Sequence, residues 1–145
     1  MQLGKIKTTV GKLYFGSVPE EEDTLTLNKL NLYCIWNLAE ELKNISYKGI
    51  DSVFVEYANI KDFSIPEDKY FFLDQLNRMT YLLKFDKSIL VHCFGGHGRT
   101  GMAIACILRR LEGISSDEAL KIAYDKCGGP ETLEQKEFVR KLIID

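Results

Sequence analysis

Cysteine, histidine and proline are scarce in this chain, and each scarcity excludes a class of structure. Four cysteines are scattered along the 145 residues, without the spacing of a disulfide-stapled secreted scaffold. They are Cys34, Cys93, Cys106 and Cys127. Two histidines are too few for a histidine-rich metal centre. With three prolines and no Pro/Gly/Ser-rich tract, the sequence shows no linker, and we expect one domain over residues 1–145.

Long hydrophobic runs and an excess of basic charge are also missing. No apolar stretch reaches the roughly 18 residues of a membrane helix. The first residues, "MQLGKIKTTVGKLYFG", lack the apolar core of a signal peptide. The net charge of −2 provides no general attraction for nucleic acid or an anionic membrane. We therefore expect a monomeric, cytoplasmic protein with reduced thiols and neither nucleic acid nor membrane as a partner.

Short apolar runs predict the strands of a sheet. They lie at residues 12–16, 32–38, 52–58 and 88–93, and residues 8–10 are a candidate for a further edge strand.

Helical patterns lie between and after these runs. One begins at Pro66, and another ends at Gly113. Capping-box spacings precede the last two, at Ser115 with Glu118 and at Thr132 with Gln135. This order predicts an α/β fold with a mostly parallel sheet of four to five strands and helices on both faces.

The segment "SILVHCFGGHGRTGMAIACIL" (88–108) is compatible with several chemistries. A zinc site is disfavoured because the neighbouring side chains of His92 and Cys93 point to opposite faces of a strand, and no further cluster completes the ligand set. Residues 96–101 spell the dinucleotide-binding pattern G-x-G-x-x-G, but too few residues follow for such a domain. A Walker loop requires Gly-Lys-Ser/Thr, whereas this chain has arginine at position 99.

A phosphate-binding loop built around a thiol accounts for the whole segment. A strand leads to Cys93, five residues form a loop, and Arg99 stands where a helix begins. The loop glycines, Gly95, Gly96 and Gly98, let successive backbone N–H groups converge on one anion. The N-terminus of the helix adds partial positive charge, which favours the thiolate. Arginine can bind phosphate oxygens in a planar, two-pronged manner.

His92-Cys93, five residues and Arg99-Thr100 resemble the H-C-x5-R-S/T signature of the cysteine-dependent protein tyrosine phosphatases. The short chain, without a recognisable Asn-Arg-Tyr phosphotyrosine loop, is similar to the compact dual-specificity type. The loop filling, Phe94, Gly95, Gly96, His97 and Gly98, is most similar to that of the cyclin-dependent-kinase-associated phosphatase and small microbial relatives.

The resemblance implies a role for each signature residue. Cys93 forms a phosphocysteine intermediate, and Arg99 with the backbone amides of residues 94–98 binds the phosphate. Thr100 donates a hydrogen bond to the departing thiolate, and His92 orients the loop from behind. The residues leave open whether His97 tunes Cys93 or faces the substrate.

The resemblance also implies a general acid on a loop between a strand and a helix, often as D-x-x-x-P. "DFSIP", which starts at Asp62, has this pattern, and we select Asp62 over the other upstream aspartates. Those are Asp51, Asp68, Asp74 and Asp86. In "PETLEQKEF", Glu131 and Gln135 align with two glutamines that larger relatives use to place the hydrolytic water; here Gln135 is also a cap partner of Thr132.

The predicted function is therefore hydrolysis of phosphotyrosine in proteins, with phosphoserine and phosphothreonine as further candidates, and without a metal or cofactor. Phosphoinositide phosphatases of this superfamily tend to carry lysines in the loop, where this chain has Phe94 and His97. An RNA 5′-phosphatase is expected to be more basic. A phosphate-binding module without turnover remains the alternative from another class, and a peroxide-sensitive Cys93 is compatible with either. Phe63 and Phe94 are candidates for the mouth of the site and, equally, for the core.

Overall fold

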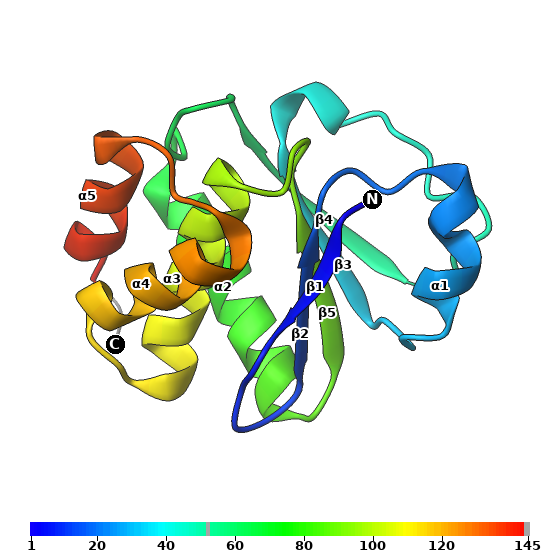
Figure 1. The fold of residues 1–145 in the computed structure, drawn as a ribbon, viewed down its shortest axis with the longest axis horizontal. Coiled ribbons are helices and arrows are strands. Elements are labelled where there is room, and N and C mark those ends of the chain that lie inside the picture. Colours follow the sequence, from blue (N-terminus) through cyan, green and yellow to red (C-terminus); the bar gives the residue numbers. More distant parts are fainter. Residues whose placement is uncertain (52, 144–145) are drawn as a thin grey trace.

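One five-stranded sheet organises the chain, with its strands in the order β1-β2-β5-β3-β4 (Figure 1). The computed structural model describes residues 1–51 and 53–143. The strands are β1 (Leu3–Ile6), β2 (Lys12–Gly16), β3 (Cys34–Ala39), β4 (Phe54–Ile60) and β5 (Ser88–His92). The predicted segment 52–58 begins at a residue outside the described ones.

Four of the strands run parallel, as the sequence predicts. β5 lies between β2 and β3, and β3 pairs with β4, all in parallel, whereas β1 is antiparallel to β2. Every residue of β3 is buried, and so are the last four of β5. Strands covered on both faces need apolar residues at successive positions, which explains why these runs do not alternate with polar residues.

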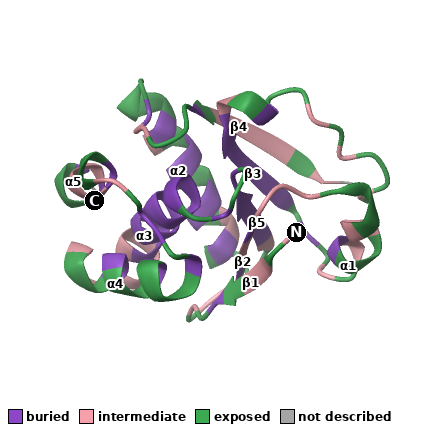
Figure 2. Cartoon of the chain, turned by 45° about the horizontal axis from the view of Figure 1, so that its top comes forward, coloured by how far each residue is buried: buried purple, intermediate pink, exposed green. Residues whose placement is uncertain are grey.

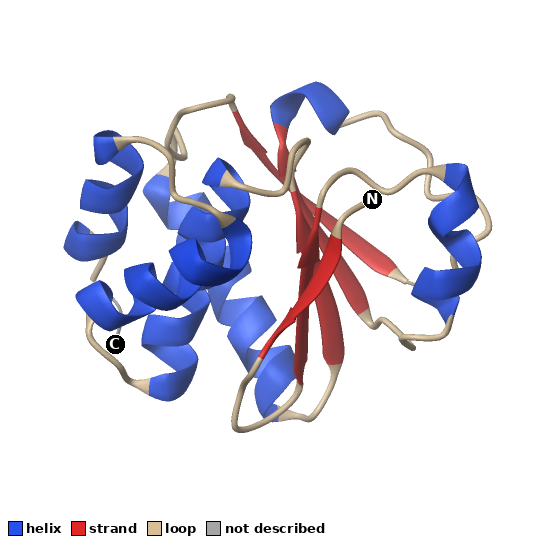
Figure 3. Ribbon diagram, viewed as in Figure 1, coloured by secondary structure: helices blue, strands red, loops and turns tan. Residues whose placement is uncertain are grey.

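Helices lie on both faces of the sheet, with most of them on one (Figures 1 and 3). The larger layer contains α2 (Lys69–Lys84), α3 (Gly98–Glu112), α4 (Ser116–Cys127) and α5 (Leu133–Lys141). The opposite face carries the short α1 (Thr24–Asn28). Two 3₁₀ turns, η1 (Glu21–Asp23) and η2 (Glu40–Leu42), complete the regular elements of the described residues.

Helix α3 is the centre of the larger layer. Its residues from Gly98 to Leu108 are all buried (Figure 2). The helix packs against α2, α4 and α5 as well as against the sheet. Gly113 ends it in the left-handed conformation (φ +67°), as predicted for a C-terminal glycine. The core thus holds in place the helix whose first turn contains Arg99.

Two predicted boundaries were wrong. The edge strand is β1, not residues 8–10, because the backbone there turns into the hairpin that pairs Ile6 with Leu13. Helix α2 begins at Lys69 and not at Pro66, because the side chain of Asp68 accepts hydrogen bonds from the backbone of Tyr70 and Phe71. In the described residues no helix combines the length and the apolar character needed to cross a membrane.

Candidate active site

The predicted site residues meet at the carboxyl end of the parallel strands. Cys93 follows β5, and Asp62 follows β4 by one residue. Glu41 lies in the turn η2 after β3. In open α/β sheets, ligands bind at this edge because the loops there converge.

The loop between β5 and α3 wraps around the sulfur of Cys93. The Sγ atom accepts hydrogen bonds from the backbone N–H of Gly96, at 3.3 Å, and from the hydroxyl of Thr100, at 3.0 Å. Gly96 has φ +82°, and a Cβ at this position would collide with the backbone of Gly16 and Ser17. The path of the loop around the sulfur therefore requires glycine at position 96.

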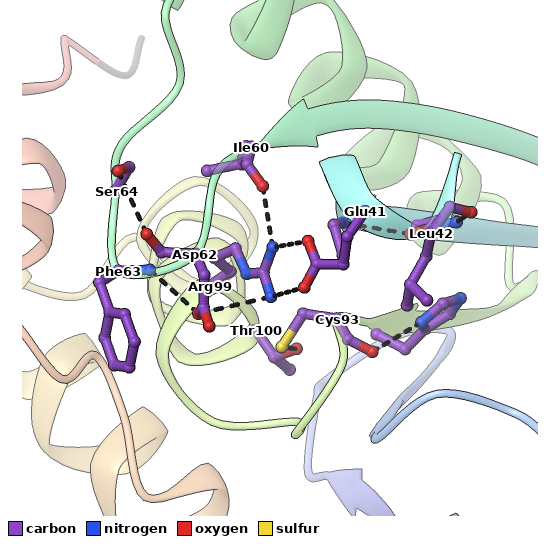
Figure 4. A network of polar contacts seen from close by, with 12 residues as sticks. Glu41, Leu42, Ile60, Asp62, Phe63, Ser64, Cys93, Arg99 and Thr100 are labelled. Carbon is purple, nitrogen blue, oxygen red and sulfur yellow. Dashed lines mark hydrogen bonds and ion pairs between the residues drawn. The ribbon is translucent and has the colours of Figure 1, made fainter. Parts of the chain in front are cut away.

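The guanidinium of Arg99 is buried, with 2% of the residue exposed, and its two Nη atoms are hydrogen-bonded to protein groups (Figure 4). Nη1 and Nη2 donate to the two carboxylate oxygens of Glu41 at 2.6 and 2.7 Å, and Nη1 also donates to the carbonyl of Ile60 at 2.9 Å. In the described part of the chain, Nε has no hydrogen-bond partner although it is buried. A bound anion can supply the missing acceptor.

Glu41 is a site residue that sequence reasoning missed. Its hydrogen bonds from Arg99 lower the pKa of its carboxyl, so that it carries a negative charge at neutral pH. This charge fixes the plane of the guanidinium in advance of any ligand. Glu41 belongs to the acidic pair after a buried strand, "NLAEE", and that position at the strand end was the available signal.

Asp62 is the upstream aspartate that the structure brings to Arg99. Its Oδ1 lies 3.4 Å from Nη2 of Arg99 (Figure 4). The same oxygen accepts a hydrogen bond from the backbone N–H of Phe63, which is in the left-handed conformation at φ +60°. By contrast, Asp68 caps α2, and Asp86 lies in the turn before β5, where it accepts from the N–H of Gly11.

His92 contacts the start of the loop through one ring nitrogen and Tyr47 through the other. Burial lowers its pKa to about 4, so the ring is neutral at pH 7. Nδ1 lies 3.0 Å from the carbonyl of Cys93, an acceptor, and must carry the proton; Nε2 therefore accepts from the hydroxyl of Tyr47 at 2.6 Å. The carbonyl of Cys93 thus sets the tautomer of His92, and Tyr47, a second residue that the sequence did not reveal, donates to the other ring nitrogen.

This arrangement predicts that His92 stays neutral in mildly acidic solution. A folded-state pKa near 4, below the ordinary 6.5, means that the unfolded chain binds more protons between these values. Stability should therefore fall as the pH drops through this window, by about 2 kcal/mol from this group at pH 5. The ring resonances in NMR, assigned with a His97→Asn variant, should show a neutral His92 at pH 5. A His92 midpoint near 6.5 would refute a buried, neutral ring.

The segment from Cys127 to Gln135 lies against the outer side of the loop, where Cys127 contacts the side chain of His97. Nδ1 of His97 is 2.6 Å from the carbonyl of Cys127. Gly101, in the first turn of α3, touches the backbone of Gly129 so closely that a Cβ there would collide with it. Gln135 forms the predicted capping box with Thr132. This segment therefore braces the loop.

The two aromatic candidates are outside the core, since Phe63 is 58% exposed and Phe94 is 57% exposed. The other three cysteines are buried, and burial raises the pKa of each thiol to about 12. Protonated thiols are poor nucleophiles.

No group of three or more His, Cys, Asp or Glu side chains that could hold a metal occurs in the described ranges.

A cysteine in a glycine-rich loop, with a buried arginine in the helix that follows, is the arrangement that the resemblance to compact dual-specificity phosphatases implies. The family model "Polymorphic toxin system, DSP-PTPase phosphatase" matches residues 10–112. The chain belongs to this family of dual-specificity and tyrosine phosphatases.

Individual relatives agree with this assignment. The tyrosine-protein phosphatase yvh1 of Schizosaccharomyces pombe is 28% identical over 142 residues, covering 87% of this chain and 42% of that protein. The crystal structure of Tk-PTP in its active form superimposes with a TM-score of 0.79 and 27% identity, over 92% of this chain and 94% of the other. Kinase associated phosphatase, with serine in place of its catalytic-site cysteine, shares the fold at a TM-score of 0.73 and 22% identity, over 90% and 84%. The chain spans about half the length of the curated relatives it matches.

Proposed function

We propose that this protein hydrolyses phosphate monoesters, foremost phosphotyrosine in proteins, through a phosphocysteine intermediate. The observation that carries the proposal is the geometry at Cys93. The sulfur has two hydrogen-bond donors directed at it, beside a buried arginine whose Nε is unpartnered within the described residues. Such an arrangement suits a sulfur nucleophile facing a bound phosphate.

In the first chemical step, the Cys93 thiolate attacks phosphorus. A sulfur–phosphorus bond forms, the bond to the ester oxygen breaks, and Asp62 gives its proton to that oxygen. Arg99, held in plane by Glu41, and the loop N–H groups bind the equatorial oxygens. In the second step, Asp62 takes a proton from water, which attacks phosphorus. The sulfur leaves as a thiolate, to which the hydroxyl of Thr100 donates a hydrogen bond.

Two exposed aromatic rings support an aryl substrate. Phe94 lies in the loop itself, where its carbonyl accepts from the N–H of Val18 at 2.9 Å, and Phe63 follows the proposed acid. Neither ring is needed in the core, and both are free to contact an aromatic ring next to the phosphate. Phosphoserine and phosphothreonine are the weaker candidates because they offer these rings no aromatic partner.

An Asp62→Asn variant should lose more activity toward esters with a poor leaving group than toward esters with a good one. We expect kcat to fall roughly 10²-fold for phenyl phosphate, whose leaving oxygen needs a proton, and much less for 2,4-dinitrophenyl phosphate. Steady-state kinetics with both esters, in the presence of a chelator, measure this directly. Asp74→Asn, on the exposed side of α2, is the matched control and should behave as wild type.

Two outcomes would contradict the proposal. An equal loss for both esters would assign the acid role to another group. Loss of wild-type activity in the chelator would exclude the thiol mechanism, since it requires no metal.

We further propose that residues 1–145 form one domain that acts as a monomer in a reducing, cytoplasmic compartment. All four cysteines are free thiols, and one core cluster connects the main sheet face with α2, α3, α4 and α5. A dimer mass in light scattering would refute the monomer.

A further inference from the structure

Gln135 is buried completely, although it is polar and lies at the N-terminal end of a surface helix. Both ends of its amide are used. Oε1 accepts from the backbone N–H groups of Glu131, at 3.0 Å, and Thr132, at 3.3 Å. Nε2 donates to the carbonyl of Ser64 at 3.1 Å, which connects residues 71 positions apart.

The capping box alone does not require glutamine. A glutamate three residues after the cap makes the same contacts to Glu131 and Thr132, and its charge is favoured at a helix N-terminus. A carboxylate has no hydrogen to donate to Ser64, however. The bond to Ser64 is thus the one that depends on an amide at this position.

Ser64 belongs to the turn that carries Asp62. The backbone N–H of Ser64 donates to the carbonyl of Lys61, and its hydroxyl donates to the carbonyl of Asp62. Lys61, Asp62 and Phe63 are exposed. Within the described part of the chain, two polar contacts connect residues 61–64 to a distant element. One is the ion pair between Asp62 and Arg99, and the other is the hydrogen bond from Gln135 to Ser64.

The same C-terminal segment contacts the phosphate-binding loop. The carbonyl of Cys127 accepts a hydrogen bond from the ring of His97, and the backbone of Gly129 lies against Gly101. Gln135 therefore connects the turn of Asp62 to the segment that braces the loop of Cys93.

We propose that Gln135 is a positioning residue, which holds the turn of Asp62 over the bound phosphate through its N–H bond to Ser64. This inference rests on the proposed function. It differs from a role for Gln135 in placing the hydrolytic water, because it acts on protonation of the leaving group and not on hydrolysis of the phosphocysteine.

The test is a Gln135→Glu variant, which keeps the cap and removes the donor. We expect kcat for phenyl phosphate to fall about 10-fold with KM changed less than about twofold, and kcat for 2,4-dinitrophenyl phosphate to stay near wild type. Combined with Asp62→Asn, the change should cause no further loss. Thr132→Ala, which weakens the cap and leaves the bond to Ser64, should lower the melting temperature without changing the dependence on leaving group.

The outcomes separate the two hypotheses. An equal loss for both esters, with a burst of the phenol, would show a role in placing water and overturn the inference. So would a variant that folds with unchanged kinetics; if Gln135→Glu does not fold, Gln135→Ala is assayed by the same criteria. A wild-type protein without Cys93-dependent turnover would overturn both the inference and the proposed function.

Discussion

Cys93→Ser is expected to abolish hydrolysis of aryl phosphates, with kcat reduced by at least about 10⁴-fold. A serine hydroxyl stays protonated at neutral pH and offers no thiolate, and the donors from Gly96 and Thr100 cannot compensate for this. Steady-state turnover of phenyl phosphate, with mass spectrometry for the covalent phosphoryl adduct, measures the loss.

The variant should still bind phosphate, because Arg99 and the loop amides are unchanged. Calorimetric titration with a phosphotyrosine peptide should give affinity within about tenfold of the wild-type KM, and phosphorylated peptide should remain bound without being consumed. Cys34→Ser is the matched control, since Cys34 begins β3 at the end of the sheet away from the loop, and it should retain activity. Comparable turnover by Cys93→Ser would exclude Cys93 as the nucleophile.

Arg99→Lys should reduce kcat by roughly 10²–10³-fold although the positive charge is retained. Lysine cannot occupy both carboxylate oxygens of Glu41, reach the carbonyl of Ile60 and present a further N–H to phosphate at once. We also expect weaker inhibition by inorganic phosphate, which a competition assay measures.

The control for this variant is Arg78→Lys, because Arg78 makes a similar two-pronged pair with Glu56 on the surface of α2. That variant should retain activity, and circular dichroism should show both variants folded. Wild-type kcat in a folded Arg99→Lys protein would show that a general positive charge suffices, contrary to the planar contact argued above.

The local sequence was sufficient to predict those parts of the structure whose contacts are made between residues close together in the chain. The loop from Cys93 to Thr100 and the start of α3 are encoded within a few residues, because glycines, a helix N-terminus and an arginine act over one turn of chain. The end of α3 at Gly113 and the capping box at Thr132 are equally local. The predicted start of α2 was wrong because both Pro66 and Asp68 are common near the start of a helix. The side chain of Asp68 caps the helix by accepting backbone hydrogen bonds, so α2 begins at Lys69.

Other parts of the site depend on the order of the strands. Glu41 reaches Arg99 across 58 residues because β3 lies next to β5, which places the turn after β3 beside the phosphate-binding loop. Tyr47 reaches His92 from a loop with no regular structure. Gln135 reaches Ser64 because α5 packs against α3 and α4, which brings its first turn beside the turn after β4. Sequence spacing contains no information about such distances.

By itself, the sequence determined the chemistry of this protein: a thiol, an arginine and a glycine-rich loop before a helix, with Asp62 as the proposed acid. The tertiary structure decided how that chemistry is held in place. It chose Glu41 as the partner of Arg99, Tyr47 as the partner of His92 and Gln135 as the contact of the acid turn. The physical reason is that a loop's own hydrogen bonds are formed by sequence neighbours, whereas its rigidity comes from buried polar partners that only the packing of distant elements brings within reach.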